Sequence, residues 1–148
     1  MRSYSAKYRY LPHTAEKAFV AYGSTFVKAL ENAAEAMLGI MFDIKKIREQ
    51  RAGVASASIS KRARNKEDLV WYALQGILEE VDEKGLNAYA FKVRSYSSRA
   101  GIESLKGAIV YKRLRADFSL LDIKAVTPYD LSVKNSARGW LIHVVVDV

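Results

Sequence analysis

The sequence has 148 residues, a net charge of +8 and a hydrophobic content of 50%. This length suits one compact domain, residues 1–148, with a core of its own. Because cysteine is absent, disulfides, thiolate zinc sites and cysteine nucleophiles are excluded. The first residues contain no apolar segment typical of a signal peptide, and no apolar run approaches the ~20 residues of a membrane helix. We therefore expect a soluble, cytoplasmic protein without a membrane partner.

Much of the positive charge lies in three clusters, at residues 45–48, 61–66 and 112–115. One interpretation is that these clusters are solvated loop and strand surfaces, as most charge runs are. The other is direct contact with an anionic partner such as RNA. Neither an aromatic-interleaved RNP motif nor a GXXG loop accompanies the clusters. The sequence alone leaves both interpretations open.

Two segments have the periodicity of amphipathic helices. Apolar residues recur at three- and four-residue spacing over 25–41, which predicts a helix with Ser24 as its N-cap. A second apolar stripe over 66–84 predicts another helix. Asn65 is expected to cap the start of this helix, and Gly85 to end it.

The rest of the chain is typical of strands. Apolar and polar residues alternate over 89–93, as in a strand with one buried face. The apolar, β-branched run 140–148 is typical of a central strand, and 135–139 predicts a turn before it. Other extended segments are expected at residues 54–59, 107–118, 119–127 and 131–134. The order of elements predicts an α+β fold, a two-layer sandwich of two main helices packed on a largely antiparallel sheet.

Three short motifs are spread from the beginning to the end of the chain. Residues 13–16 read His-Thr-Ala-Glu and are followed by an extended stretch, an aromatic-Gly pair at Tyr22–Gly23 and a helix. Residues 124–127 read Lys-Ala-Val-Thr, and residues 145–148 read Val-Val-Asp-Val. In order and spacing, this set resembles the archease family. That family opens with His-Thr-Ala-Asp, has a Lys-Ala-hydrophobic-Thr motif and ends in hydrophobic-Asp-hydrophobic.

The resemblance implies a non-enzymatic activator of an RtcB-type tRNA-splicing ligase. Archeases promote the transfer of a guanylyl group from GTP to a histidine of this ligase, and they allow it many turnovers. The ligase joins RNA ends that carry a 2′,3′-cyclic phosphate or 3′-phosphate to 5′-hydroxyl ends. By this resemblance, GTP is used by the ligase rather than bound by this chain, and contact with RNA is indirect, through the ligase.

Carried over residue by residue, the resemblance implies a metal site of Glu16, Asp147 and Val148. As the last residue of the sequence, Val148 is expected to add carboxylate oxygens. Oxygen ligands without sulfur favour a hard divalent cation, Ca²⁺ or alternatively Mg²⁺ or Mn²⁺. The family's lysine falls on Lys124, which would offer its charge to a phosphate or to an acidic surface of the ligase. His13 would take part in partner contact or activation, or would fix its loop by hydrogen bonds.

The chain departs from the family pattern at two places. Glu16 replaces the usual Asp, which lengthens the reach of the carboxylate by about 1.5 Å. Pro128-Tyr129 stands where the family commonly has Tyr-His, and a phenol with an ordinary pKa of ~10 does not replace a base of neutral pH. We expect these changes to affect metal affinity and potency but not the fold. His143 is flanked by apolar residues, and we expect it to be a hydrogen-bonded strand histidine rather than a ligand.

Two other classes of function compete with the activator. A metal-dependent enzyme needs a nucleophile or a general base besides the metal. The sequence contains no H-E-x-x-H motif and no cysteine, and we recognise no Ser-His-Asp set, which argues against an enzyme. The main alternative is a basic RNA-binding or chaperone-like module that acts on tRNA or on its processing enzymes.

Overall fold

The computed structural model describes residues 3–12 and 16–148. Within these residues the chain forms seven strands and three helices. In chain order they are β1 (Tyr8–Leu11), β2 (Lys17–Gly23), α1 (Phe26–Met41), α2 (Ile44–Glu49), β3 (Val54–Ala63), α3 (Lys66–Lys84), β4 (Asn87–Arg99), β5 (Ile102–Lys112), β6 (Ala125–Ser136) and β7 (Gly139–Asp147).

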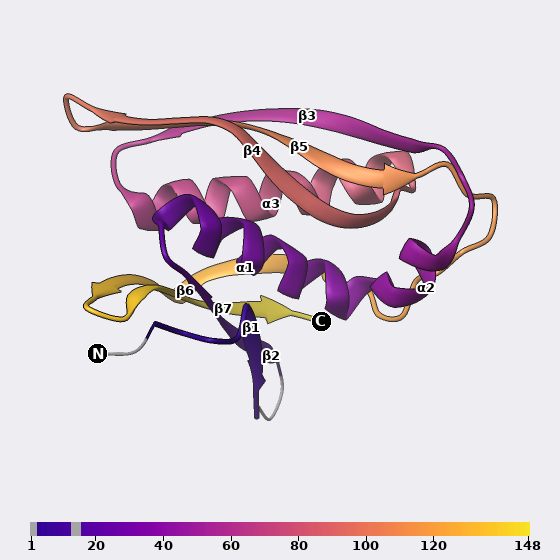
Figure 1. Cartoon of the computed structure of the whole chain (residues 1–148), viewed down its shortest axis with the longest axis horizontal. Coiled ribbons are helices and arrows are strands. Elements are labelled where there is room, and N and C mark those ends of the chain that lie inside the picture. Colours follow the sequence, from indigo (N-terminus) through magenta and orange to yellow (C-terminus); the bar gives the residue numbers. More distant parts are fainter. Residues whose placement is uncertain (1–2, 13–15) are drawn as a thin grey trace.

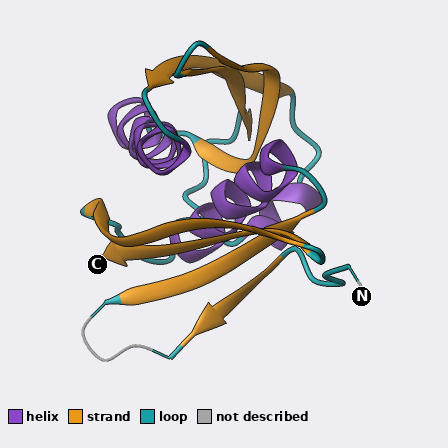
Figure 2. Cartoon of the chain, turned by 90° about the vertical axis from the view of Figure 1, so that its left-hand side faces the viewer, coloured by secondary structure: helices purple, strands orange, loops and turns teal. Residues whose placement is uncertain are grey.

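The strands form two antiparallel sheets with the two long helices between them (Figure 1). One sheet has the strand order β1-β2-β7-β6 and the other the order β3-β5-β4. Helix α1 packs against β2 and β7 on one side and β4 on the other, and α3 packs against β3 and β6. The predicted α+β fold with antiparallel pairing is confirmed. The structure adds that the strands divide between two sheets, one on each side of the helix layer (Figure 2).

The burial of α1 explains this layered arrangement. Seven of its apolar side chains have no exposed surface at all: Ala29, Leu30, Ala33, Ala34, Ala36, Met37 and Leu38. The side chains of residues 33, 34, 36, 37 and 38 are distributed around most of the helix circumference. A helix that is apolar on several sides must be covered on several sides. Two sheets therefore enclose α1, and both contribute to one hydrophobic core.

The helix ends follow local hydrogen-bonding rules. Asn65 caps α3 by accepting a 2.7 Å hydrogen bond from the Asp68 N–H, and the helix ends at Gly85 with φ of 63°, both as predicted. The predicted cap of α1, Ser24, is wrong by one residue. Thr25 has the extended backbone of an N-cap, and its hydroxyl accepts from the Lys28 N–H at 3.1 Å.

The tail is a central strand, as predicted, because β7 lies between β2 and β6. Residues 113–124, predicted to be extended, are instead mostly irregular. This segment crosses from the three-stranded sheet to the four-stranded sheet and is held by an isolated bridge between Phe42 and Ser119. In the described part of the chain, no helix is both long and apolar enough to span a membrane.

Candidate functional site at the edge of the four-stranded sheet

The pairing of β2 with β7 brings the two ends of the chain together. Their ladder runs from Gly23 opposite Trp140 to Lys17 opposite Val146. Glu16 lies just before β2, and one further step of this register would set it opposite Asp147. Opposed residues of antiparallel strands have Cα atoms about 4.5–5.5 Å apart and share a face of the sheet. The two predicted carboxylate side chains would therefore extend from neighbouring backbone positions at the end of the sheet. We call this end of the sheet the acid edge (Glu16, Asp147).

Side-chain alternation shows which face the acid edge uses. Phe19 and Val144 face α1 and are completely buried, whereas Ala18 and Val145 form the next pair, on the opposite face. Asp147 lies two residues beyond Val145, so regular alternation places its side chain on the face turned away from the helices. Asp147 is exposed and Glu16 is half-buried, so solvent reaches both.

The residue directly before the neighbouring strand β6 adds a lysine to the same region. The Lys124 N–H donates a 2.7 Å hydrogen bond to the Asp147 carbonyl, and Ala125 pairs with Asp147. Val148 follows directly and is half-buried against the core. The structure thus brings Lys124, Asp147 and Val148 together, and Glu16 directly precedes Lys17, which pairs with Val146. His13, the remaining predicted residue, lies outside the described residues.

The donor set at the acid edge fits a hard cation. Two carboxylates on opposed residues can share one ion, and main-chain oxygens of Val148 lie next to them. Over residues 3–12 and 16–148, no group of three or more His, Cys, Asp or Glu side chains is arranged to hold a metal ion. The predicted site has only two such side chains, Glu16 and Asp147, and would need main-chain oxygens of Val148 as further ligands. Calcium binding at this edge therefore stays a prediction.

The segment that departs from the family pattern interrupts the β6–β7 ladder. Pairing is irregular between Thr127 and Ser132, and Asp130 has a left-handed φ of 60°. Tyr129 is 78% exposed, so its phenol is in solvent. The His143 ring nitrogen Nδ1 lies 2.8 Å from the carbonyl oxygen of Asp130. This contact confirms the hydrogen-bonded strand histidine expected from the sequence.

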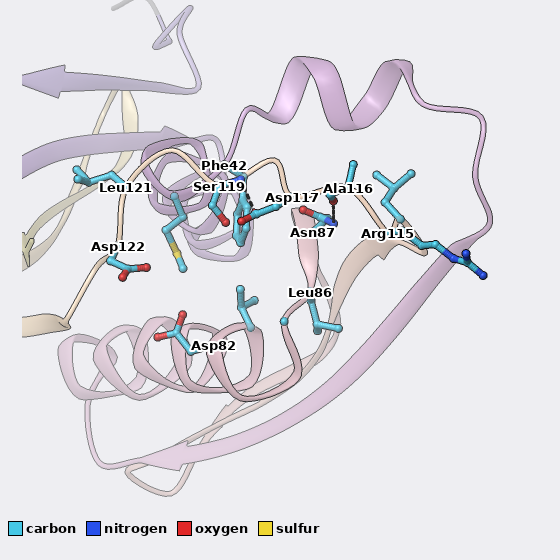
Figure 3. A pocket seen from close by; sticks show the side chains of 14 residues that line it. Phe42, Asp82, Leu86, Asn87, Arg115, Ala116, Asp117, Ser119, Leu121 and Asp122 are labelled. Atoms are coloured by element: carbon cyan, nitrogen blue, oxygen red, sulfur yellow. Dashed lines mark hydrogen bonds between the residues drawn. The ribbon is translucent and has the colours of Figure 1, made fainter.

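A polar cleft of about 290 Å³ lies beside the ends of α1 and α3, under the irregular segment (Figure 3). It contains three carboxylates, Asp82, Asp117 and Asp122. Burial, and next the nearby charge of Asp122, raise the pKa of Asp82. Hydrogen bonds from the side chain and main chain of Ser119 lower the pKa of Asp117. This cleft could not be predicted from the sequence, because its residues come from separate segments without a shared motif.

Exposed apolar side chains lie close to the acid edge. Leu120 is 62% exposed, Leu121 41% and Tyr10 47%. Leu121 and Tyr10 line a shallow hollow that also includes Lys17 and Ala18, the residues that follow Glu16. Sequence reasoning missed these leucines, since a pair of apolar residues in an irregular segment has no periodicity to interpret. An exposed apolar patch of this kind is typical of a protein-contact surface.

These features define a small α+β protein in which two sheets enclose the long helices and the ends of the chain meet at one sheet edge. The chain belongs to the archease family. The model of that family, described as "Archease protein family (MTH1598/TM1083)", matches residues 8–148. The chain is 32% identical to Protein archease of Methanosarcina acetivorans and 34% identical to that of Methanosarcina barkeri, over all of each chain. The resemblance seen in the sequence is confirmed.

Two solved structures share the fold. The solution structure of Methanobacterium thermoautotrophicum protein 1598 matches with a TM-score of 0.81 at 21% identity and covers 96% of this chain and 99% of that one. A crystal structure from Thermotoga maritima, described as "an archease, possible chaperone", matches with a TM-score of 0.51 at 18% identity, covering 93% and 94%. At these identities, the likeness supports the fold alone.

Proposed function

We propose that the protein is a non-enzymatic, metal-binding activator of an RtcB-type tRNA-splicing ligase. In this role it promotes GTP-dependent guanylylation and turnover of the ligase in the cytoplasm. One observation supports the proposal: the β2–β7 ladder ends with Lys17 opposite Val146, so its continuation would set Glu16 opposite Asp147, next to Val148 and Lys124. Membership of the archease family supports action on a partner protein, because one relative is described as a possible chaperone.

Each residue of the acid edge has a role in this proposal. Glu16 and Asp147 would hold Ca²⁺, or alternatively Mg²⁺ or Mn²⁺, with main-chain oxygens of Val148. A bound divalent cation would supply concentrated positive charge at the sheet edge. Lys124 is exposed and adds a second positive charge beside it, for a phosphate or for an acidic surface of the ligase. His13 is assigned to partner contact only by its place in the family motif.

Protein docking is supported by the apolar surface beside the acid edge. Stable protein interfaces combine an apolar centre with a polar rim. Leu121 and Tyr10 offer an apolar centre of this kind, and Leu120 is exposed next to Leu121 in the chain. Lys17 and Lys124 lie toward the acid edge. We assign this surface to the ligase.

The histidine within the described residues, His143, supplies no base to the acid edge, which is in keeping with an activator. The sequence has two histidines, His13 and His143. His143 is held against the Asp130 carbonyl on a different part of β7 from Asp147. GTP is accordingly assigned to the ligase, which performs the chemistry.

The proposal is tested by adding the purified protein in small amounts to the matching ligase with GTP and Ca²⁺ or Mg²⁺. We expect more guanylylated ligase and more joined RNA per ligase molecule. A double variant, Leu120→Ser with Leu121→Ser, should lose most of this stimulation. The control Tyr72→Ser removes an apolar side chain that is 38% exposed on α3 and should keep it. Unchanged guanylylation and turnover on adding the wild-type protein would contradict the proposal.

The second candidate is a basic RNA-binding or chaperone-like module that acts on tRNA or its processing enzymes. Its support is the net charge of +8, which favours anionic partners. RNA binding combined with no effect on the ligase would favour this candidate.

A further inference from the structure

The outer face of the three-stranded sheet has an unusual charge composition. Strands β3, β4 and β5 cover the helices with one face and leave the other uncovered (Figures 1 and 2). Together they contain a single acidic residue, Glu103. Its carboxylate is on the inner side, where it is 5% exposed and bonded to Lys66, Tyr96 and Ser98. The outer face of these strands therefore has no carboxylate.

The register identifies the side chains on this outer face. Ser60 pairs with Lys106, and Arg62 with Ser104, while Ile59 before Ser60 and Leu105 between Ser104 and Lys106 are buried against the core. On the other side of β5, Lys92 pairs with Ala108. We call the resulting surface the serine-basic face: Arg62, Lys92, Arg94, Lys106, Ser56, Ser58, Ser60, Ser95, Ser97 and Ser104.

The four cations of the serine-basic face are exposed and uncompensated. In the described part of the chain, no carboxylate forms an ion pair with any of them. Lys106 is diagonal to both Arg62 and Lys92, so their Cα atoms are about 7–8 Å apart. Like charges held this close repel one another, and an anion bound between them would relieve the repulsion.

Two shallow hollows lie on the same face, and Lys106 borders both. One, of about 360 Å³, also includes Arg62 and the serines of the β4–β5 hairpin. The other, of about 310 Å³, includes Arg94 with Ser58 and Ser60. The face thus combines cations and hydroxyl donors around two neighbouring depressions.

We infer that the serine-basic face binds the sugar–phosphate backbone of double-stranded RNA. Arginine, lysine and serine are the side chains that typically donate to phosphate oxygens. Serine hydroxyls also bond to the 2′-hydroxyl that distinguishes RNA from DNA. The contact would be direct and independent of the ligase, so it does not rest on the activator role.

The aromatic residues of these strands favour a duplex over a single strand. Proteins that bind single strands stack bases on exposed aromatic rings. Here the aromatic side chains of β4 and β5 all belong to the core or pack against it: Tyr89, Phe91, Tyr96 and Tyr111. The absence of exposed rings also disfavours a protein partner, since protein interfaces are enriched in aromatic anchors.

The test is the binding of a labelled RNA hairpin, measured by fluorescence anisotropy at several salt concentrations. The triple variant Lys92→Ser, Arg94→Ser, Lys106→Ser removes three cations of the face. The control Lys45→Ser, Arg51→Ser, Arg113→Ser removes three exposed cations near α2 and lowers the net charge equally. Circular dichroism and thermal melting establish that both variants are folded, and the single change Lys106→Glu is a milder second variant.

We expect the face variant to weaken binding by about 10-fold or more and the control by less than about 3-fold. The slope of log affinity against log salt should fall by roughly 0.9 for each lost phosphate contact. Equal losses in both triple variants, or no binding by the wild-type protein, would overturn the inference. Equal affinity for a DNA duplex of the same length would overturn the preference for RNA. Equal affinity for a poly-glutamate chain of matched charge would overturn the assignment to nucleic acid.

Discussion

The two sheets share one helix layer but present opposite chemistry to solvent. The four-stranded sheet carries the acid edge, formed by Glu16 and Asp147, and exposed apolar side chains lie beside it. The three-stranded sheet carries the serine-basic face, which has no carboxylate and no exposed aromatic ring. Because the sheets lie on opposite sides of the helices, the proposed cation-binding edge and the proposed anion-binding face would not neutralise each other (Figure 1).

This comparison shows how a net charge of +8 is distributed. A uniform positive surface would repel a divalent cation from the acid edge. Carboxylates lie at the end of β2 and β7, whereas unpaired cations lie on β4 and β5. The acid edge therefore keeps its negative charges and the serine-basic face its positive charges. Both sheets pack against the same helix layer, so the stability of one sheet depends on that of the other. The following predictions test that separation.

The largest expected effect concerns the shared core. Phe19 in β2 is fully buried and Phe91 in β4 is 1% exposed. Replacing either by alanine should lower the free energy of unfolding by about 3–5 kcal/mol. Because α1 packs against both strands, each variant should unfold in a single transition. Urea denaturation followed by far-UV circular dichroism and by fluorescence of Trp71 and Trp140 measures this. Two separate transitions would show that the sheets are independent units.

A second, smaller effect is expected at the acid edge. Asp147→Asn removes one of two carboxylates, and Ca²⁺ affinity should fall by roughly 100-fold, as losses in metal sites commonly do. Because Asp147 is exposed, the melting temperature without metal should hardly change. Isothermal titration calorimetry gives the affinity. The control Asp122→Asn removes a carboxylate from the polar cleft and should bind Ca²⁺ like the wild-type protein. An unchanged affinity in Asp147→Asn would remove this residue from the proposed site.

The third effect depends on pH. Burial alone would raise the pKa of Glu103, but hydrogen bonds from Ser98, Tyr96 and Lys66 outweigh it and lower the pKa. A lowered pKa in the folded protein stabilises it above the ordinary pKa of the carboxyl, and this contribution is lost as the pH falls through the folded value. Glu103→Gln should therefore cost about 1–3 kcal/mol at pH 7.

In acid, the difference between wild type and Glu103→Gln should shrink, because the stability contributed by the ionised carboxyl is lost as the pH falls below its ordinary pKa and toward the folded value. Urea denaturation at neutral pH and at about pH 3 compares them. Glu83→Gln, at an exposed position near the end of α3, serves as the control and should have little effect at either pH. A difference that is equal at both pH values would show that the charge of Glu103 does not matter.

The smallest effects are expected in the polar cleft, with opposite signs for two neighbours. Burial and the charge of Asp122 raise the pKa of Asp82, so its ionised form is penalised in the folded protein. Stability is then lost as the pH rises through the folded pKa. Because Asp82 is largely exposed and solvent screens its charge, Asp82→Asn should stabilise the protein only slightly at pH 7. Asp117 has a lowered pKa, so Asp117→Asn should be slightly destabilising. Thermal melting at pH 7 shows whether each variant is more or less stable than the wild-type protein. Melting temperatures that shift in the same direction would contradict the opposite effects expected for Asp82 and Asp117.

The sequence predicted those features that depend on local rules. Helix α3 follows from its apolar stripe, from Asn65 before it and from Gly85 after it. The central position of β7 follows from its continuous apolar run. The N-cap of α1 was missed because Ser24 and Thr25 are adjacent hydroxyl residues, and only the backbone conformation decides between them.

Features that combine distant segments could not be predicted in this way. Alternation in a strand shows that one face is buried, but it does not show which sheet or helix covers it. The division into two sheets, the Asp82–Asp122 pair and the serine-basic face all need the strand register or the packing of separate elements. Glu16 and Asp147 were associated from the family motif, and the register that makes them neighbours is known only from the structure.

The position of β7 also affects the order in which the molecule can be completed during synthesis. On the ribosome, β2 is made early and β6 more than a hundred residues later, yet neither pairs with the other; both pair with β7. The four-stranded sheet therefore remains split until β7 leaves the exit tunnel, and pairing over such a long separation is intrinsically slow. A nascent chain that stops before β7 has two unpaired strand edges, which makes it prone to aggregation. Only a chain that includes β7 can assemble the acid edge, so an incomplete product would lack the proposed metal site.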